Sequence, residues 1–198
     1  MRCPCALLLL IGGLALTACS TLQPPAAPAV IALQRDQLDA FSLSGRFSLR
    51  HEGSSHAGRI DWQHDGDRNR LLLSSPFGQA MLEIVGDADG ARLSGSDGHS
   101  QTASSVDELL QSALAYPLSL SQLADWLRGR HAAGDELVRD ALERPQQLRH
   151  EDLRIAYEYD SDQPQALPSR LFVDREDGFV LRLSIDQWLP LTPGEQGR

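Results

Sequence analysis

The sequence contains no lysine, and its 18 basic side chains are all arginines, set against 27 acidic side chains. The formal net charge is −9 and the pI is near 5.0. The arginines do not cluster along the sequence, whereas a nucleic-acid-binding protein needs a basic patch. The composition therefore argues against nucleic acid as a partner. Because anionic headgroups repel an acidic body, we expect any membrane contact beyond a covalent anchor to be apolar.

Recognisable catalytic and metal-binding motifs are missing as well. There is no G-x-S-x-G, no H-E-x-x-H, no phosphate-binding loop and no spaced pair of cysteines. The six histidines mostly fall in predicted turns or loops and lack a third ligand. We therefore expect no catalytic residue, no metal and no cofactor, and a protein that is not an enzyme.

No hydrophobic run is long enough to span a bilayer. The run Ala6–Leu16 follows the basic Arg2 and has the length of a signal-peptide core. The next residues, Leu-Thr-Ala up to Cys19, resemble the lipobox of bacterial lipoproteins, in which the cysteine is acylated and the signal is cut before it. The alternative is an ordinary secretory signal with an incidental cysteine.

On the lipobox interpretation, residues 1–18 are the signal peptide and Cys19 carries the lipid. Cys3 and Cys5 leave with the signal, so no disulfide can form within the mature chain. Ser20 follows Cys19 in place of the Asp that resembles an inner-membrane retention signal, so we expect the outer membrane. Each buried methylene of the acyl chains contributes about 0.8 kcal/mol, which makes such an anchor permanent.

The remaining chain predicts one mostly β domain on a tether. Residues 19–30 are rich in Pro and Ala and predict an extended tether, residues 31–190 a single domain, and residues 191–198 a flexible tail. Phe41–Arg50 alternates apolar and polar residues, which indicates a strand with one wet face in an antiparallel sheet. Gly45 within it marks a possible bend.

The alternation recurs along the chain and is interrupted by helical patterns. Further strands are predicted around Ile60 and Trp62, at Leu71–Leu73, Ala80–Val85 and Ala91–Ser94, at Ile155–Tyr159, around Leu171 and Val173, and at Phe179–Ile185. A capping box over Ser105–Glu108 begins one helix, which extends to about Ala115, and a second helix starts near Leu120. Ile31–Ala40 predicts a short helix, and we expect Arg130–Leu153 to be irregular.

The stretch Leu71–Val85 predicts a tight hairpin with an unusual tip. Pro76 presets φ and Gly78 accepts a positive φ, so the turn leaves Phe77 at or near the tip. A soluble protein normally places a polar residue there. Either the loop folds back to bury the ring, or the ring enters something apolar outside the domain, and the predicted membrane anchor favours the second interpretation.

The apolar residues exceed what the strands alone need. One sheet capped by an apolar helix pair can close on itself as a packed core. It can also curl into a half-open barrel whose inner wall is a pocket for acyl chains. The three tryptophans, Trp62, Trp126 and Trp188, suit either arrangement.

Several segments together resemble the family of outer-membrane lipoprotein receptors LolB. They are Phe41–Phe47, Trp62, the hairpin Leu72–Gln79, Trp126–Gly129 and the closing strand through Trp188, in this order behind the lipobox. The resemblance implies an unclosed antiparallel β-barrel with a helical lid over a hydrophobic cavity. It also implies a receptor that takes lipoproteins from the periplasmic carrier LolA and inserts them into the outer membrane without nucleotide hydrolysis.

The resemblance assigns roles to particular residues. Phe77, between Pro76 and Gly78, takes the place of an exposed apolar tip residue, often Leu in the family, that is needed for insertion rather than for receiving cargo. We expect the acyl-chain cavity to be lined by Phe47, Ile60, Trp62, Leu123, Trp126, Leu127 and Leu183, and the protein to act as a monomer. The competing hypotheses are a lipocalin-like binder of a free lipid, an envelope assembly scaffold and an envelope enzyme.

Overall fold

The computed structural model describes residues 34–114 and 119–191. The chain divides into two compact units, Met1–Ile31 and Ala32–Arg198, and the described residues belong to the second. The predicted signal peptide, Cys19, the tether over residues 19–30 and all but the first residue of the predicted tail therefore lie outside the described residues.

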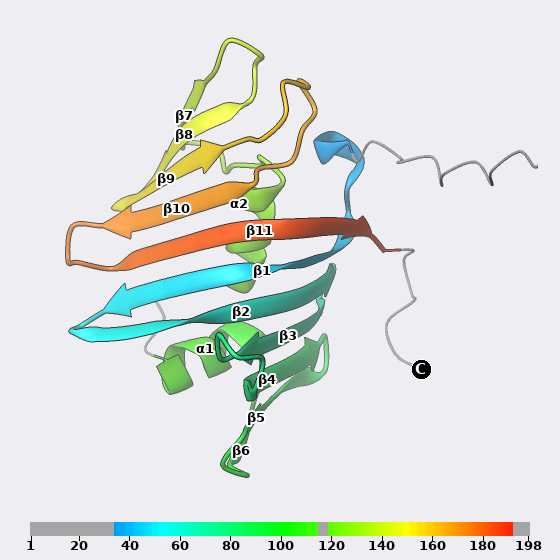
Figure 1. Ribbon diagram of the computed structural model, residues 1–198, viewed down its shortest axis with the longest axis vertical. Helices are drawn as coiled ribbons and strands as arrows, with labels where there is room; N and C mark the ends of the chain where they lie inside the picture. The colour runs from blue at the N-terminus through cyan, green and yellow to red at the C-terminus, as the bar shows by residue number, and fades with distance from the viewer. Residues whose placement is uncertain (1–33, 115–118, 192–198) are drawn as a thin grey trace, which may run out of the picture. The chain divides into compact units, whose positions relative to one another are not determined.

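A single antiparallel sheet dominates the domain (Figure 1). The strands lie in the order β6-β5-β4-β3-β2-β1-β11-β10-β9-β8-β7. Consecutive strands pair from β1 to β6 and from β7 to β11, and the pairing of β1 with β11 joins the two series. Within the described chain, β6 and β7 form the two margins and do not pair with each other, so the barrel is unclosed. The predicted fold class is confirmed. The strands are β1 (Ala40–His51), β2 (Ser54–Asp65), β3 (Arg68–Ser74), β4 (Ala80–Asp87), β5 (Gly90–Gly95), β6 (Ser100–Ala103), β7 (Glu136–Arg139), β8 (Pro145–His150), β9 (Leu153–Glu158), β10 (Arg170–Arg175) and β11 (Val180–Pro190).

The two-residue periodicity of β1 sets which side of the sheet is apolar. Phe41, Leu43, Phe47 and Leu49 are buried on one face, while the polar residues that alternate with them are partly or fully exposed. At Gly45, where a bend was predicted, the pairing with β11 slips by one residue, and an added Cβ would lie 2.2 Å from the Ser184 carbonyl oxygen. Only glycine allows the two backbones to approach so closely.

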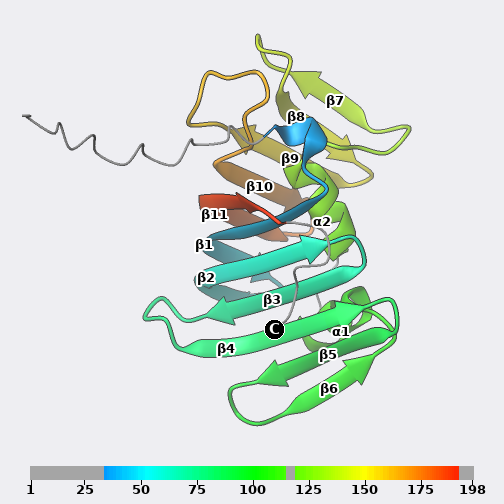
Figure 2. The ribbon, with the colours of Figure 1, turned by 90° about the vertical axis from the view of Figure 1, so that its right-hand side faces the viewer.

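Two helices cover the apolar face of the sheet, α1 (Val106–Leu114) and α2 (Leu120–Leu127) (Figure 2). The α1 cap forms nearly as predicted: the Glu108 amide donates to the Ser105 hydroxyl, while the Glu108 carboxylate accepts from Ser104 rather than from Ser105. The Ser104 hydroxyl and amide hold the pKa of Glu108 below its ordinary value. α2 begins with Ser119, whose hydroxyl accepts from the Gln122 amide.

Three local predictions differ from the structure. The segment 130–153 is not irregular throughout, because it contains β7 and β8 at one margin of the sheet. β6 at the other margin was not predicted as a strand, and instead of a helix over 31–40 the described residues hold a 3₁₀ turn at Arg35–Gln37 before β1. The margin strand β7 buries few side chains, so its sequence lacks the alternation that marks inner strands. β8 begins with Pro145, which is not typical of an inner strand.

One end of the apolar face is packed by aromatic rings. The Phe41 ring lies 5.3 Å from both the Trp62 and the Trp188 ring, in edge-to-face geometry. The Trp62 indole N–H donates to Asn69 Oδ1, and His64 Nδ1 lies 2.9 Å from the same oxygen. Trp62 is fully buried, so this end of the domain is solid core.

Candidate functional site: an apolar pocket beside an exposed phenylalanine

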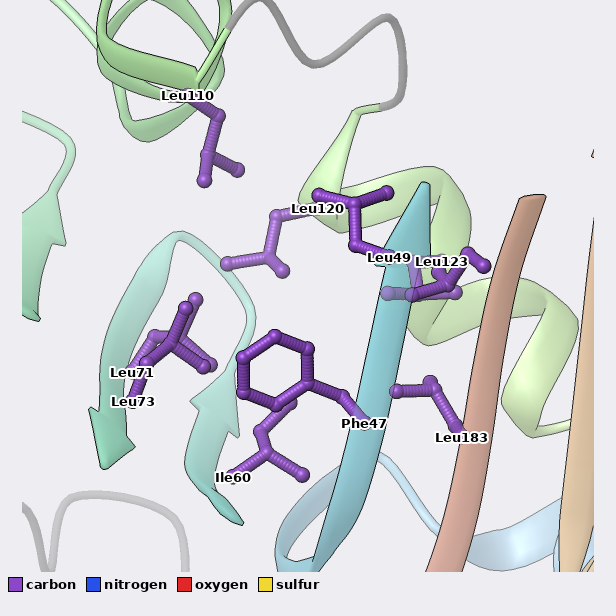
Figure 3. Close-up of a pocket in the computed structure, with 10 residues that line it drawn as sticks. Phe47, Leu49, Ile60, Leu71, Leu73, Leu110, Leu120, Leu123 and Leu183 are labelled. Atoms are coloured by element: carbon purple, nitrogen blue, oxygen red, sulfur yellow. The ribbon is translucent and has the colours of Figure 1, made fainter. Parts of the chain in front are cut away.

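An apolar pocket lies between the helices and the middle of the sheet (Figure 3). Each lining side chain is a hydrocarbon, so the pocket offers no hydrogen bond to an occupant. The lining residues are Phe47 and Leu49 of β1, Ile60 of β2, Leu71 and Leu73 of β3, Leu181 and Leu183 of β11, Leu110 of α1, and Leu120 and Leu123 of α2. A lining of this kind is complementary to an apolar ligand.

The pocket is small, with a volume of about 60 Å³. A dry cavity of about 150 Å³ holds one benzene molecule, so an acyl chain fits only if the pocket enlarges. A second, open hollow of about 350 Å³ adjoins it and shares three of its wall residues, Phe47, Leu49 and Leu73. The hollow is also lined by Met81, Leu82 and Leu93 and has a polar rim that includes His56, Asp97 and His99. The two spaces thus share a wall, and the hollow opens beside the β3–β4 hairpin.

The loop between β3 and β4 presents Phe77 to solvent, with 95% of its surface exposed. The loop is closed by the Gly78 amide, which donates to the Ser75 carbonyl at 2.8 Å, and by the Ser75 amide, which donates to the Gln79 carbonyl at 2.8 Å. Gly78 has φ +86° and so takes the conformation predicted for it. The ring is held out by an ordered turn and does not fold back onto the core.

Four of the seven residues predicted to line the cavity lie around the pocket: Phe47, Ile60, Leu123 and Leu183. The other three are buried elsewhere. Trp62 belongs to the aromatic end of the core, Trp126 packs its ring 5.6 Å from that of His150, and Leu127 is fully buried. The six further lining residues, Leu49, Leu71, Leu73, Leu110, Leu120 and Leu181, were not predicted. Their positions in the strand and helix periodicity were the available signal, but periodicity does not distinguish pocket from packed core.

The two ends of α2 are attached to the rest of the domain by different contacts. Arg128, at the end of α2, is buried and donates to the Asp39 carbonyl at 3.0 Å and to the Asp125 carboxylate at 2.7 Å. Burial lowers the pKa of Arg128. At the other end of α2, the Leu120 amide donates to Asp107 of α1 at 2.7 Å. The end of α2 next to the pocket is therefore held by α1, by apolar contacts and by the Gln122 side chain, and among the described residues no buried arginine like Arg128 holds it.

A polar cluster links the first turn of α2 to the end of β8. His150 Nδ1 lies 2.8 Å from Asp135 Oδ1, and its Nε2 lies 3.3 Å from the Gln122 amide group. Burial raises the pKa of Asp135, but the hydrogen bonds from His150 and from the Ala132 amide outweigh it, so the pKa is lowered overall. The cluster therefore contributes to the attachment of α2 to the sheet.

Two further findings bear on the class of protein. Among the described residues, no group of three or more His, Cys, Asp or Glu side chains is arranged to hold a metal ion. In the same part of the chain, no helix combines the length and the apolar character needed to cross a membrane.

These features define a class of protein: an unclosed antiparallel half-barrel with two covering helices, an apolar pocket and an exposed aromatic tip. The family model described as "Outer membrane lipoprotein LolB" matches residues 39–188. The chain belongs to the LolB family of outer-membrane lipoproteins, as the sequence motifs predicted, and the predicted outer-membrane location agrees with this membership.

Curated relatives with the name "Outer-membrane lipoprotein LolB" match over nearly their full length. The protein of Dechloromonas aromatica is 33% identical over 82% of this chain and 88% of its own. That of Azoarcus is 34% identical over 92% and 94%, and that of Thiobacillus denitrificans is 35% identical over 88% and 91%. A solved DUF1329 family protein from Desulfovibrio piger is similar in fold alone, with a TM-score of 0.52 at 9% identity over 79% of this chain and 87% of its own.

Proposed function

We propose that this protein is the receptor that takes lipoproteins from the periplasmic carrier LolA and inserts them into the outer membrane, anchored there through lipidated Cys19. The observation that carries the proposal is the apolar pocket and its adjoining hollow, which open beside an almost fully exposed phenylalanine. The remaining steps follow from the physical chemistry of acyl chains.

Acyl chains need continuous shelter from water. A lipoprotein carries tens of methylenes, and at about 0.8 kcal/mol each they do not cross water on a useful timescale. A receptor must therefore replace the carrier's cavity with its own before release. The hydrocarbon lining supports this role, and transfer needs no nucleotide if the receptor cavity binds the chains more tightly than the carrier does.

Acceptance of cargo requires the pocket to grow. At about 60 Å³ it is too small for an acyl chain, and its helical wall consists of Leu110, Leu120 and Leu123. Because α2 is fixed at Arg128 and more weakly held near Leu120, we infer that the Leu120 end moves outward with α1. Such a movement would join the pocket to the hollow of about 350 Å³.

Phe77 directs release. Burying its ring in lipid contributes about 1.5–3 kcal/mol, which is enough to orient an anchored domain but too little to hold it at a membrane alone. The ring would therefore turn the open side of the domain toward the bilayer.

The test is transfer from a lipoprotein–LolA complex to this protein and then to liposomes. Phe77→Glu should leave acceptance near the wild-type level and reduce release at least tenfold, while Phe77→Leu should retain release. Leu189→Glu is a matched control, because Leu189 is also an exposed apolar residue but lies at the far end of β11. Release by Phe77→Glu at the wild-type rate would contradict the role of the ring.

The same assay separates the competing hypotheses. A lipocalin-like binder of free lipid would take up a fluorescent fatty acid but no lipoprotein from the carrier. An assembly scaffold would take up neither.

A further inference from the structure

We propose that the outer face of the sheet carries a binding site for the headgroups of anionic phospholipids, made by arginines on β1, β2 and β11. The proposal deepens the proposed function, because it rests on the insertion of Phe77 at the same end of the domain. It also changes the expectation, drawn from the overall negative charge, that membrane contact is purely apolar.

Strand register gathers four arginines that lie far apart in the sequence. Arg46 of β1 lies directly opposite Arg59 of β2, and Arg182 of β11 lies opposite Ser48, between Arg46 and Arg50. Directly opposite residues are about 5 Å apart and diagonal neighbours about 7–8 Å. All four side chains are exposed and alternate with the buried residues of their strands, so they lie on the face of the sheet opposite the helices. We name Arg46, Arg50, Arg59 and Arg182 the arginine patch.

The charge of the arginine patch is largely uncompensated. Arg46 pairs with Asp186 at 3.1 Å. Over residues 34–114 and 119–191, neither Arg50 nor Arg59 nor Arg182 has an ion pair or a side-chain hydrogen bond, although the protein as a whole is acidic. Like charges placed opposite each other in a sheet are destabilising. A bound anion would remove that repulsion.

The sheet is hollowed beside the patch, with a volume of about 260 Å³. The side chains that reach this hollow are Arg46, Arg170, Arg182, Ser48, Ser184 and Phe172. Arginine binds phosphate oxygens through two parallel N–H donors, and serine hydroxyls add further donors. The half-buried Phe172 ring gives the hollow one apolar wall, which suits the glycerol carbons of a headgroup better than a bare ion.

The register also ties the patch to the Phe77 loop. Arg59 lies opposite Ser74, the last residue of β3 before the loop begins. Three residues carry the chain roughly 10 Å from Ser74 to the tip at most. β1 extends from Arg46 to Arg50 in the same direction over about 13 Å. Arg182 lies opposite Ser48, only about 7 Å along β1 from the level of Ser74. When the Phe77 ring enters the bilayer, Arg182 therefore lies at the depth of the headgroups.

The test is binding of the mature chain, residues 19–198 with Cys19→Ala, to two kinds of vesicle. One kind contains phosphatidylcholine alone, and the other contains added phosphatidylglycerol. Each arginine near an anionic surface contributes about fivefold in affinity, equivalent to about 1 kcal/mol. The double variant Arg59→Gln/Arg182→Gln should therefore bind the anionic vesicles about 25-fold more weakly, with no change on phosphatidylcholine, and the difference should shrink at high salt.

Arg92→Gln is the matched control, because Arg92 is also exposed and unpaired in the described part of the chain but lies on β5, away from the patch. Phe77→Ser should weaken binding to both kinds of vesicle, so failure of that variant alone would count against the proposed function and not against the patch. If the double variant binds anionic vesicles as well as Arg92→Gln does, the headgroup site is overturned, and an acidic protein surface becomes the better partner for the patch.

Discussion

Leu123 and Leu127 stand one helical turn apart on α2, and both are almost completely buried. Leu123 borders the pocket, whereas Leu127 packs in the core on all sides. The two leucines therefore separate the contribution of the pocket from that of the core, with the same side chain in the same helix.

We predict that Leu127→Ala lowers the free energy of unfolding by about 2–5 kcal/mol, as is usual for a leucine deleted from a packed core. Leu123→Ala should cost less, because one side of Leu123 already faces empty space and has fewer contacts to lose. Leu123→Ala should also increase the uptake of a fluorescent fatty acid by enlarging the pocket. Urea unfolding and fatty-acid fluorescence measure the two effects. Equal loss of stability with no gain in uptake would mean that the pocket is ordinary core.

At the scale of elements, the helices and the sheet are joined unevenly. The hydrogen bond from the Leu120 amide to Asp107 links α1 to the start of α2, where the helix borders the pocket. The buried Arg128 fixes the other end. A helix held in this way is expected to open first at its weaker end.

We predict that Asp107→Ala makes the amides of Leu120 and Leu123 exchange with solvent about fivefold to tenfold faster, while the amide of Arg128 is unaffected. The loss of a typical hydrogen bond costs about 0.5–1.5 kcal/mol, and the upper part of this range corresponds to the expected change in exchange rate. Asp107→Asn keeps an acceptor oxygen and is the matched control, which should exchange at nearly the wild-type rate. Hydrogen exchange followed by NMR gives the residue-level answer. Faster exchange at both ends of α2 would contradict the uneven attachment.

The elements also differ in how far they could be predicted from the sequence. β1, the hairpin with Phe77 and the α1 cap were predictable, because each depends on residues close together in the chain. β6 and β7 were missed, since a four-residue margin strand buries too little to show a pattern. The arginine patch was also missed, because Arg46, Arg59 and Arg182 become neighbours only through strand register. For the same reason, Trp62 and Trp126 could not be assigned to core or pocket.

At the scale of the whole molecule, a buried histidine links stability to pH. His64 is 3% exposed at the aromatic end of the core, with Asn69 Oδ1 as its partner. Burial lowers the pKa of His64, and the hydrogen bond to Asn69 only partly opposes this effect. The folded state therefore binds a proton at this ring less readily than the unfolded state does.

We predict that the stability contributed by neutral His64 is complete above about pH 6.5, the pKa of an unfolded histidine, and is lost as the pH falls toward the lowered folded pKa. One such group changes the free energy of unfolding by up to about 1.4 kcal/mol per pH unit. Denaturant unfolding between pH 7.5 and about 5 should show this slope, and His64→Gln should reduce it. His131→Gln, at an exposed loop position, should keep the slope. An unchanged slope in His64→Gln would assign the acid sensitivity to other groups.

In the described sheet, the margins β6 and β7 are not paired with each other, and this affects how the apolar pocket can enlarge. In a closed β-barrel, the diameter is set by the number of strands and their stagger, so widening the barrel requires breaking hydrogen bonds between strands. A curved sheet with two unpaired edge strands can change its curvature while every hydrogen bond between its strands is kept. Under the proposed function, space for an acyl chain would then be gained by loosening leucine packing alone, so the domain would switch between a filled and a cargo-holding interior without breaking any strand pairing.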